Sequence, residues 1–116
     1  MIRVELTVRL PNNAGALAGV SQALADEHVN VIAMSLSDSG QLRLVIDRHI
    51  HAATVLRERH YTVIERDVLV VDRATSLTAL QLIADADINL HYAYSATSVL
   101  VLGVEDAMRA SSATGT

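Results

Sequence analysis

Residues 2 to 10 alternate strictly between apolar and polar side chains. The apolar positions are Ile2, Val4, Leu6, Val8 and Leu10, and the polar positions between them are Arg3, Glu5, Thr7 and Arg9. A period of two predicts a half-buried strand with one wet face. The strand should end at Pro11-Asn12-Asn13, because proline cannot donate to a sheet and asparagine favours turns.

The spacing of apolar residues then changes to that of a helix. Between residues 14 and about 28 they recur three and four positions apart, which places them on one helix face. These residues are Leu17, Val20 and Leu24. Asn12 or Asn13 is the predicted N-cap. We expect His28 to take the left-handed exit position, because histidine tolerates positive φ better than most residues.

Three more extended segments and one more helix follow. We expect a strand over residues 29–37, a turn at Ser37-Asp38-Ser39-Gly40, a returning strand over 41–47, a helix over 51–60 and an extended stretch over 61–71. The last stretch is either one strand or two strands that break at Arg66-Asp67. The order βαββαβ favours an antiparallel sheet with two helices on one face.

The same order of elements then begins again. The step Val29-Asn30-Val31 returns as Ile88-Asn89-Leu90, and the stretch Asn12–Leu17 returns as Asp72–Leu77. A repeat this long, with matched strand, helix and turn roles, predicts two copies of one unit. We therefore expect a first unit over residues 1–66 and a second over 67–110.

The second copy is predicted to be truncated at its C-terminal end. Only a helix start (Ala107, Met108) follows Glu105, so this copy should lack its last strand. The polar residues 111–116 should form a disordered tail.

These residues resemble the ACT domain family, in a tandem arrangement. Members carry Asp/Asn-x-Pro-Gly-x-Leu after the first strand, matched here by Asn12–Leu17 and Asp72–Leu77, and a Val/Ile-Asn-Ile/Val step at the second strand. The resemblance implies an α+β fold of two ferredoxin-like βαββαβ units, with a small ligand, usually an amino acid, at the seam between paired units. Ala14 and Ala74 replace the proline of the motif. Its glycine is kept as Gly15 but becomes Thr75 in the second copy.

The candidate ligand-binding residues follow from these motif positions. They are Asn12, Asn13, Ala14, Gly15, Ala16, Leu17, Asn30 and Val31, with Asp72 and Asn89 as weaker candidates in the second copy. Free N–H groups in the first helical turn suit a carboxylate, and Gly15 would let a ligand approach the backbone. Asn12 could bond both ends of an amino acid, and Asn30 could do the same from the partner unit.

Structural roles for the same residues remain open. Asn12 could serve only as a helix cap, and Gly15 could simply relieve crowding. Asn30 and Asn89 could only shape the turn from helix to strand.

Composition removes several classes of function. The chain of 116 residues has no cysteine, which excludes disulfides, thiol nucleophiles and thiolate metal sites, and its net charge is −4. All nine basic residues are arginine and the aromatic residues are three tyrosines. We therefore expect no nucleic-acid partner and no membrane partner. With 51% hydrophobic residues, the chain can bury a core. We expect a cytoplasmic protein.

No residue pattern predicts catalysis, a metal or a cofactor. His49 and His51 would share a strand face and could meet a metal, but spacing fixes no third ligand. We also find no nucleophile and base at a recognisable spacing. The predicted function is therefore a regulatory protein that binds an amino acid or similar small metabolite, allosteric but not an enzyme.

The resemblance also implies partners for such a protein. We expect a homo-oligomer and, as a candidate partner, a metabolic enzyme. The alternative is a degenerate ACT-like module for oligomerisation or partner binding without a ligand. In that reading, the missing last strand would leave an open sheet edge that invites pairing.

Overall fold

The computed structural model describes residues 1–11 and 13–116. The chain divides into two compact units, which are described separately. The first unit is Val4–Arg66, and the second unit is Asp67–Thr116 together with Met1–Arg3. The predicted site residue Asn12 lies outside the described residues.

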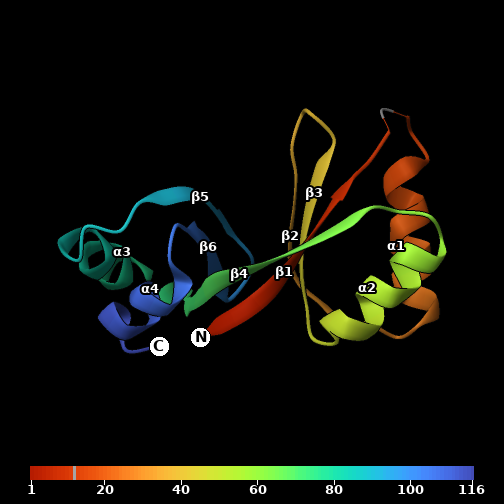
Figure 1. The fold of residues 1–116 in the computed structure, drawn as a ribbon. Helices are drawn as coiled ribbons and strands as arrows, with labels where there is room; N and C mark the ends of the chain where they lie inside the picture. The colour runs from red at the N-terminus through yellow and green to blue at the C-terminus, as the bar shows by residue number, and fades with distance from the viewer. Residues whose placement is uncertain (12) are drawn as a thin grey trace. The chain divides into compact units, whose positions relative to one another are not determined.

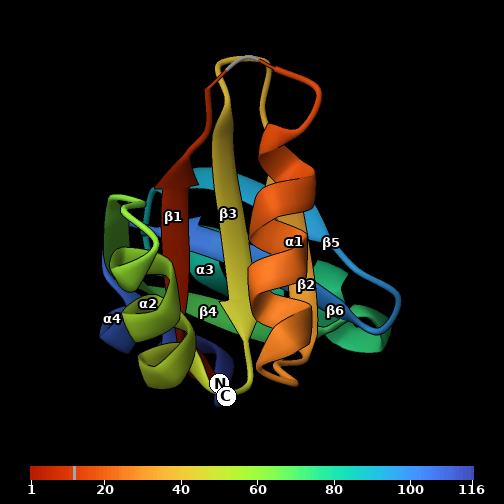
Figure 2. The same ribbon diagram turned by 90° about the vertical axis from the view of Figure 1, so that its right-hand side faces the viewer.

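The first unit has the predicted βαββαβ order and confirms the expected α+β class (Figure 1). Its elements are β1 (Ile2–Arg9), α1 (Ala16–Asp26), β2 (Val31–Leu36), β3 (Gln41–Ile46), α2 (His49–Glu58) and β4 (Val63–Asp72). The strand order is β2-β3-β1, with β3 antiparallel to both neighbours. Figure 2 shows α1 and α2 on the same face of these strands. The stretch after α2 forms one unbroken strand, and its residues are divided between the two units.

The core of the first unit lies between the two helices and the strands. It is built from the alternating positions of β1 and β3 and from the inner faces of α1 and α2. Its fully or almost fully buried residues include Leu6, Val8, Val20, Ala23, Leu42, Leu44, Ala52 and Leu56. The period of two in β1 and the spacing of three to four in α1 therefore predicted the buried positions Leu6, Val8, Val20 and Leu24 correctly. In β2 the period of two did not predict the buried side, because Met34 and Leu36 are exposed and Ala33 is buried.

Glu5 is an exception to the predicted wet face of β1. Its side chain is fully buried, and its carboxylate Oε1 lies 3.9 Å from Nε of Arg43 on the neighbouring β3. A buried charge is tolerated where an opposite charge compensates for lost hydration. The alternation predicted which residues share a face, but the expectation that this face is wet was wrong at Glu5.

The second unit repeats this plan with different details. Its elements are β4, the short 3₁₀ helix η1 (Arg73–Thr75), α3 (Ser76–Asp85), β5 (Leu90–Ser95), β6 (Val99–Val104) and α4 (Ala107–Thr114). The strands follow the order β4-β6-β5. The core cluster of the second unit contains Leu69, Val71, Ala79, Ile83, Ile88, Leu102, Val104 and Ala110.

Two local features show how closely the units match. Each edge strand has a bulge one residue after its start, between Val31 and Ala33 in β2 and between Leu90 and Tyr92 in β5. Two residues after the helix that precedes each of these strands, the chain has a residue with positive φ, His28 at 54° and Asp87 at 57°. The predicted left-handed conformation of His28 is confirmed.

The prediction that residues 111–116 form a disordered tail is wrong. Residues 107–114 form helix α4, which begins where the Asp106 carboxylate accepts a hydrogen bond from the Arg109 N–H at 3.1 Å. It ends at Gly115, whose φ of 73° suits a left-handed helix end. Ala110 is fully buried. The serines and threonines of this segment suggested disorder, but its alanines give the helix a side that packs on the core.

The chain's first residues belong to the second unit, although the repeat in the sequence predicted them in the first. After β6, the described chain adds no further strand. The Met1 ammonium instead donates to the Val70 carbonyl at 2.9 Å, and the Val70 N–H donates to the Met1 carbonyl at 2.8 Å. Ile2 packs against the core of the second unit. The strand edge that was expected to be open therefore has a partner.

Burial also lowers the pKa of the Met1 ammonium below its ordinary value of 8.0, and nearby Arg3 adds to this effect while Asp72 opposes it. Between the lowered pKa and 8.0 the unfolded chain binds more protons than the folded chain. We therefore predict that the free energy of unfolding rises with pH across this window and that this contribution is constant above it. Urea unfolding at a series of pH values measures the slope. Acetylation of the Met1 amine should abolish this component, and an unchanged slope would contradict the prediction.

Candidate functional site

A cavity of about 370 Å³ lies in the first unit, where the end of β1, the start of α1 and the β2–β3 turn meet. The described residues that line it are Leu10, Pro11, Asn13, Ala16, Leu17, Leu36, Ser37, Asp38, Ser39 and Gly40. Figure 2 shows the β2–β3 turn at the same end of the unit as the segment that leads into α1. Three of the predicted site residues, Asn13, Ala16 and Leu17, therefore lie at one cavity.

A hydrogen bond holds the β2–β3 turn against the end of β1. The Leu10 N–H donates to the Gly40 carbonyl at 2.7 Å, and within the turn the Gly40 N–H donates to the Ser37 carbonyl at 3.0 Å. Gly40 has a φ of 82°, which glycine adopts without steric cost. The turn is thus built into the cavity wall.

The N-cap of α1 is Gly15, and no side chain caps the helix. The Asn13 side chain accepts a hydrogen bond from the Gly15 N–H at 3.2 Å, which is a bond two residues ahead as in an Asx turn. The predicted N-cap role of Asn13 is therefore wrong, and that of Asn12 lies outside the described residues. Among the described residues, none accepts a hydrogen bond from the N–H groups of Leu17 and Ala18. These groups lie at the positive end of the helix dipole.

Gly15 has no structural need to be glycine. Its φ and ψ of −91° and −7° are open to any residue. A Cβ built there would meet only Asn13 Oδ1, at the ordinary contact distance of 3.8 Å. The alternative that Gly15 relieves crowding thus has no support in the geometry.

Asn30 and Val31 lie at the other end of β2 from the cavity, because β2 runs from Val31 to Leu36 and it is Leu36 that lines the cavity. The Asn30 N–H donates to Asp47 Oδ1 at 3.1 Å, and the Asp47 N–H donates to the Asn30 carbonyl at 3.2 Å. The first unit therefore does not bring its own Asn30 and Val31 to the cavity. A role for Asn30 toward a ligand bound by a partner unit stays a prediction.

The second unit contains the same pair of bonds with a glutamate in place of the aspartate. The Asn89 N–H and its side-chain amide donate to the two carboxylate oxygens of Glu105 at 2.9 and 3.4 Å, and the Glu105 N–H donates to the Asn89 carbonyl at 3.0 Å. Both asparagines thus close the ends of paired strands, which favours the turn-shaping role considered above.

At the start of α3, side-chain hydroxyls bond to the preceding backbone. Thr75 donates to the Asp72 carbonyl at 3.5 Å, and Ser76 donates to the Arg73 carbonyl at 2.9 Å. Asp72 immediately precedes η1. The helix start of the second unit therefore carries more side-chain atoms than that of the first, where Gly15 and Ala16 occupy the corresponding positions.

The β2–β3 turn is the part of the cavity that the sequence analysis did not assign to the site. Residues 37–40 were predicted as a turn, but not as a wall of the cavity. The topology contained the missing signal. In a βαββ order with antiparallel strands, the β1–α1 connection and the β2–β3 turn lie at the same end of the sheet. Asp38 is the charged residue of that turn.

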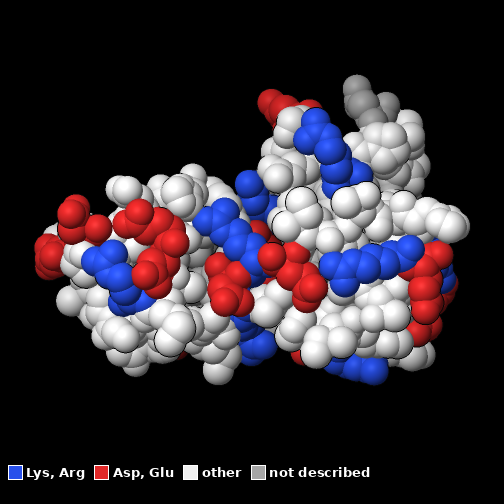
Figure 3. All heavy atoms as spheres, viewed as in Figure 1, with Lys and Arg blue, Asp and Glu red and all other residues white. Residues whose placement is uncertain are grey.

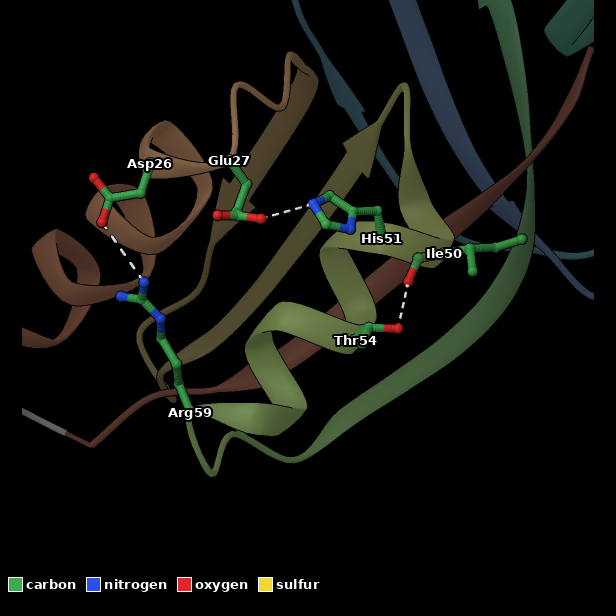
Figure 4. Close-up of polar contacts among 6 residues, drawn as sticks. All are labelled: Asp26, Glu27, Ile50, His51, Thr54 and Arg59. Atoms are coloured by element: carbon green, nitrogen blue, oxygen red, sulfur yellow. Dashed lines mark hydrogen bonds and ion pairs between the residues drawn. The ribbon is translucent and has the colours of Figure 1, made fainter.

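His49 and His51 begin helix α2 rather than sharing a strand face. His51 Nε2 lies 2.9 Å from Glu27 Oε1, and Arg59 at the end of α2 lies 3.6 Å from Asp26 (Figure 4). These pairs connect the two helices of the first unit. In the part of the chain that the structure describes, no three His, Cys, Asp or Glu side chains gather as metal ligands.

Acidic and basic side chains are interspersed over the face drawn in Figure 3. A nucleic-acid footprint would instead concentrate basic residues on one face. None of the helices in the described ranges has the length and apolar character required to span a membrane.

Comparison with known proteins agrees with this geometry. Residues 4–60 match the model of the ACT domain family, whereas no curated protein matches the chain. Protein BT0572 from Bacteroides thetaiotaomicron is similar in structure, with a TM-score of 0.87 and 21% identity over 97% of this chain and 86% of that one. The regulatory subunit of aspartate kinase from Thermus flavus aligns with a TM-score of 0.68 and 16% identity over 99% and 94% of the two chains. The ligand-free regulatory subunit of aspartate kinase from Thermus thermophilus gives the same TM-score and identity over 99% and 92%.

The family match covers almost the whole first unit, and the structural matches extend across both units. The repeated bulges and the paired Asn30 and Asn89 bonds show that the second unit follows the same plan. Residues 4–60 of this chain therefore match the ACT domain family, and the second unit repeats the same fold plan.

Proposed function

We propose that this protein is a regulatory protein that binds a free amino acid or a closely related metabolite in the cavity beside α1. It would have no catalytic activity of its own. The observation that carries the proposal is the position of the cavity against an uncapped helix N-terminus. Two of the structural neighbours are described as regulatory subunits of aspartate kinase, which supports a regulatory role.

The start of α1 is suited to a carboxylate. The N–H groups of Leu17 and Ala18 have no acceptor among the described residues, and Leu17 lines the cavity. A carboxylate placed there would accept these hydrogen bonds and meet the positive end of the helix dipole. Asn13, also in the lining, adds an amide side chain that can donate or accept.

The lining does not favour catalysis. Its hydroxyl groups, on Ser37 and Ser39, lie 2.9 Å apart and bond one another. No histidine is among the described residues of the lining, so no imidazole base faces either hydroxyl. The cavity therefore has the features of a binding site.

Regulation requires that the ligand bind one state of the protein more tightly than another. We propose that the two states differ in self-association or in association with a metabolic enzyme. Such coupling would change the affinity for the amino acid when the partner is added, and by the same factor would change the affinity for the partner when the amino acid is added.

A thermal-shift screen of the twenty amino acids tests ligand binding. An amino acid present at about 100 times its Kd should stabilise the protein by about 2.7 kcal/mol. For a chain of this size, this corresponds to an increase in Tm of several degrees. An unchanged Tm with all twenty would overturn the proposal.

The variant Gly15→Ala distinguishes an effect on ligand affinity from an effect on folding stability. We expect the free energy of unfolding to stay within about 1 kcal/mol of the wild type, because the weaker N-cap is offset by the lower entropy of the unfolded chain. The added methyl group would lie beside Asn13 at the helix start. Isothermal titration should show amino-acid affinity reduced roughly ten-fold or more. Equal affinities for the variant and the wild type would contradict a ligand at this helix start.

A second candidate function, assembly without a ligand, is favoured by the edge strand β2. The strand pairs only with β3 among the described strands, and Val31, Met34 and Leu36 remain 41–47% exposed. An apolar sheet edge favours pairing with another chain. Sedimentation velocity at micromolar concentration tests this candidate, because it requires an oligomer whether or not an amino acid is present. A monomer under both conditions would contradict it.

A further inference from the structure

The charged side chain in the described lining of the cavity beside α1 is negative. Asp38 is the acidic residue among the described residues that line it, and none of these residues is lysine, arginine or histidine. No described residue forms an ion pair with Asp38 or donates a hydrogen bond to its side chain. The carboxylate thus remains available to a positively charged group in the cavity.

The turn that carries Asp38 is held by bonds that do not involve its carboxylate. The hydroxyls of Ser37 and Ser39, on either side of it, lie 2.9 Å apart, and the Gln41 N–H donates to the Ser37 hydroxyl at 3.2 Å. The Leu10–Gly40 bond fixes the same turn to β1. The position of Asp38 in the wall is therefore set by the backbone of the turn.

The cavity combines this negative group with the positive end of α1. A ligand that satisfies both must carry an ammonium group and a carboxylate close together. A second carboxylate would be repelled by Asp38, and a molecule without an ammonium group would form no ion pair with Asp38. The Asp38 carboxylate and the α1 N-terminus together favour a ligand with one ammonium group and one carboxylate over an acidic amino acid or a 2-oxo acid.

The remaining walls are apolar. Leu10, Pro11, Leu17 and Leu36 all line the cavity. Its volume of about 370 Å³ lies at the lower end of the range of roughly 300–1,000 Å³ for ligand sites. A single amino acid with an apolar side chain matches both the size and the lining.

On the basis of the function proposed above, we infer that Asp38 binds the α-ammonium group of a neutral amino acid with an apolar side chain. The ligand carboxylate lies at the N–H groups of Leu17 and Ala18, and its side chain lies against the leucines. Asp38 is thereby the residue that distinguishes an amino acid from the corresponding oxo acid.

Isothermal titration with three probes tests this assignment: L-leucine, 4-methyl-2-oxopentanoate, which is leucine with a carbonyl in place of the amine, and L-glutamate. The wild type should bind L-leucine and bind the other two at least roughly ten-fold more weakly, since a charge-assisted hydrogen bond is lost or a repulsion added. Asp38→Asn should weaken L-leucine roughly ten-fold or more and remove the preference for leucine over the oxo acid.

Asp67→Asn is the matched control, because Asp67 is also exposed and lies in the second unit. It makes the same change in net charge and should leave L-leucine affinity unchanged. Unfolding midpoints of both variants should equal that of the wild type, which excludes loss of folding as the cause.

The outcomes separate the two proposals. If the wild type binds none of the twenty amino acids, the proposed function fails and the role of Asp38 fails with it. If an amino acid binds but Asp38→Asn leaves its affinity unchanged, or the oxo acid binds as tightly as L-leucine, only the role of Asp38 is overturned.

Discussion

Replacing Gly40 by alanine is expected to destabilise the protein by about 2–5 kcal/mol and to abolish amino-acid binding. Two effects add at this position. The φ of 82° costs a residue with a Cβ about 1–2 kcal/mol. The Cβ would also lie 2.6 Å from the Leu10 carbonyl oxygen, so the β2–β3 turn must move away from β1. Crowding of this kind typically costs about 1–3 kcal/mol. The same movement would displace Asp38 and open the cavity.

Gly115→Ala provides the control for backbone conformation. Gly115 has a similar φ of 73°, but a Cβ there would meet nothing within 4 Å. Its alanine variant should therefore lose only about 1–2 kcal/mol and keep its ligand affinity. Urea unfolding and calorimetric titration of both variants measure the difference. If the two variants lose equal stability, or if Gly40→Ala still binds, the turn is not the rigid wall described here.

Deleting Met1–Arg3 is expected to destabilise the second unit by about 2–5 kcal/mol. The deletion removes the two Met1–Val70 hydrogen bonds, each contributing about 0.5–1.5 kcal/mol. It also removes the Ile2 side chain from the core of the second unit, at about 1–2 kcal/mol for a partly buried aliphatic group. Urea unfolding measures the total. Hydrogen exchange gives the local result, because the Val70 amide should lose its protection.

Ile2→Ala separates the two contributions. This variant keeps the backbone of residues 1–3 and loses only side-chain contacts, so the Val70 amide should stay protected while stability decreases less than in the deletion. If the deletion leaves both stability and Val70 protection at wild-type values, these residues do not complete the second unit.

Periodicity predicted the elements that bury one regular face. The alternation in β1 and the three-to-four spacing in α1 gave the correct strand and helix, because burial of Leu6 or Leu24 is a local consequence of side-chain direction. The positive φ of His28 was also predictable, since only a few residue types tolerate that conformation. The repeated Asn step led to the second unit. The carboxylate that bonds each asparagine, on Asp47 or on Glu105, was visible only in the structure.

Features set by distant contacts could not be read in this way. Glu5 is buried beside Arg43, which follows 38 positions later on another strand. The serines and threonines of helix α4 alone suggest a disordered segment. The helix forms because its alanines pack against the core of the second unit. The cavity is formed by the β1–α1 connection and the β2–β3 turn together. Each was recognised as a local structure, and only the topology shows that they meet.

The pairing of Met1 with Val70 has a consequence for the order of events during translation. Residues that are made early are required by a unit whose other strands are made later, and 69 positions separate the two partners. The nascent second unit acquires this strand from residues that lie far before its other strands in the sequence. Its maturation therefore depends on a long-range encounter, which is slower than local hairpin closure.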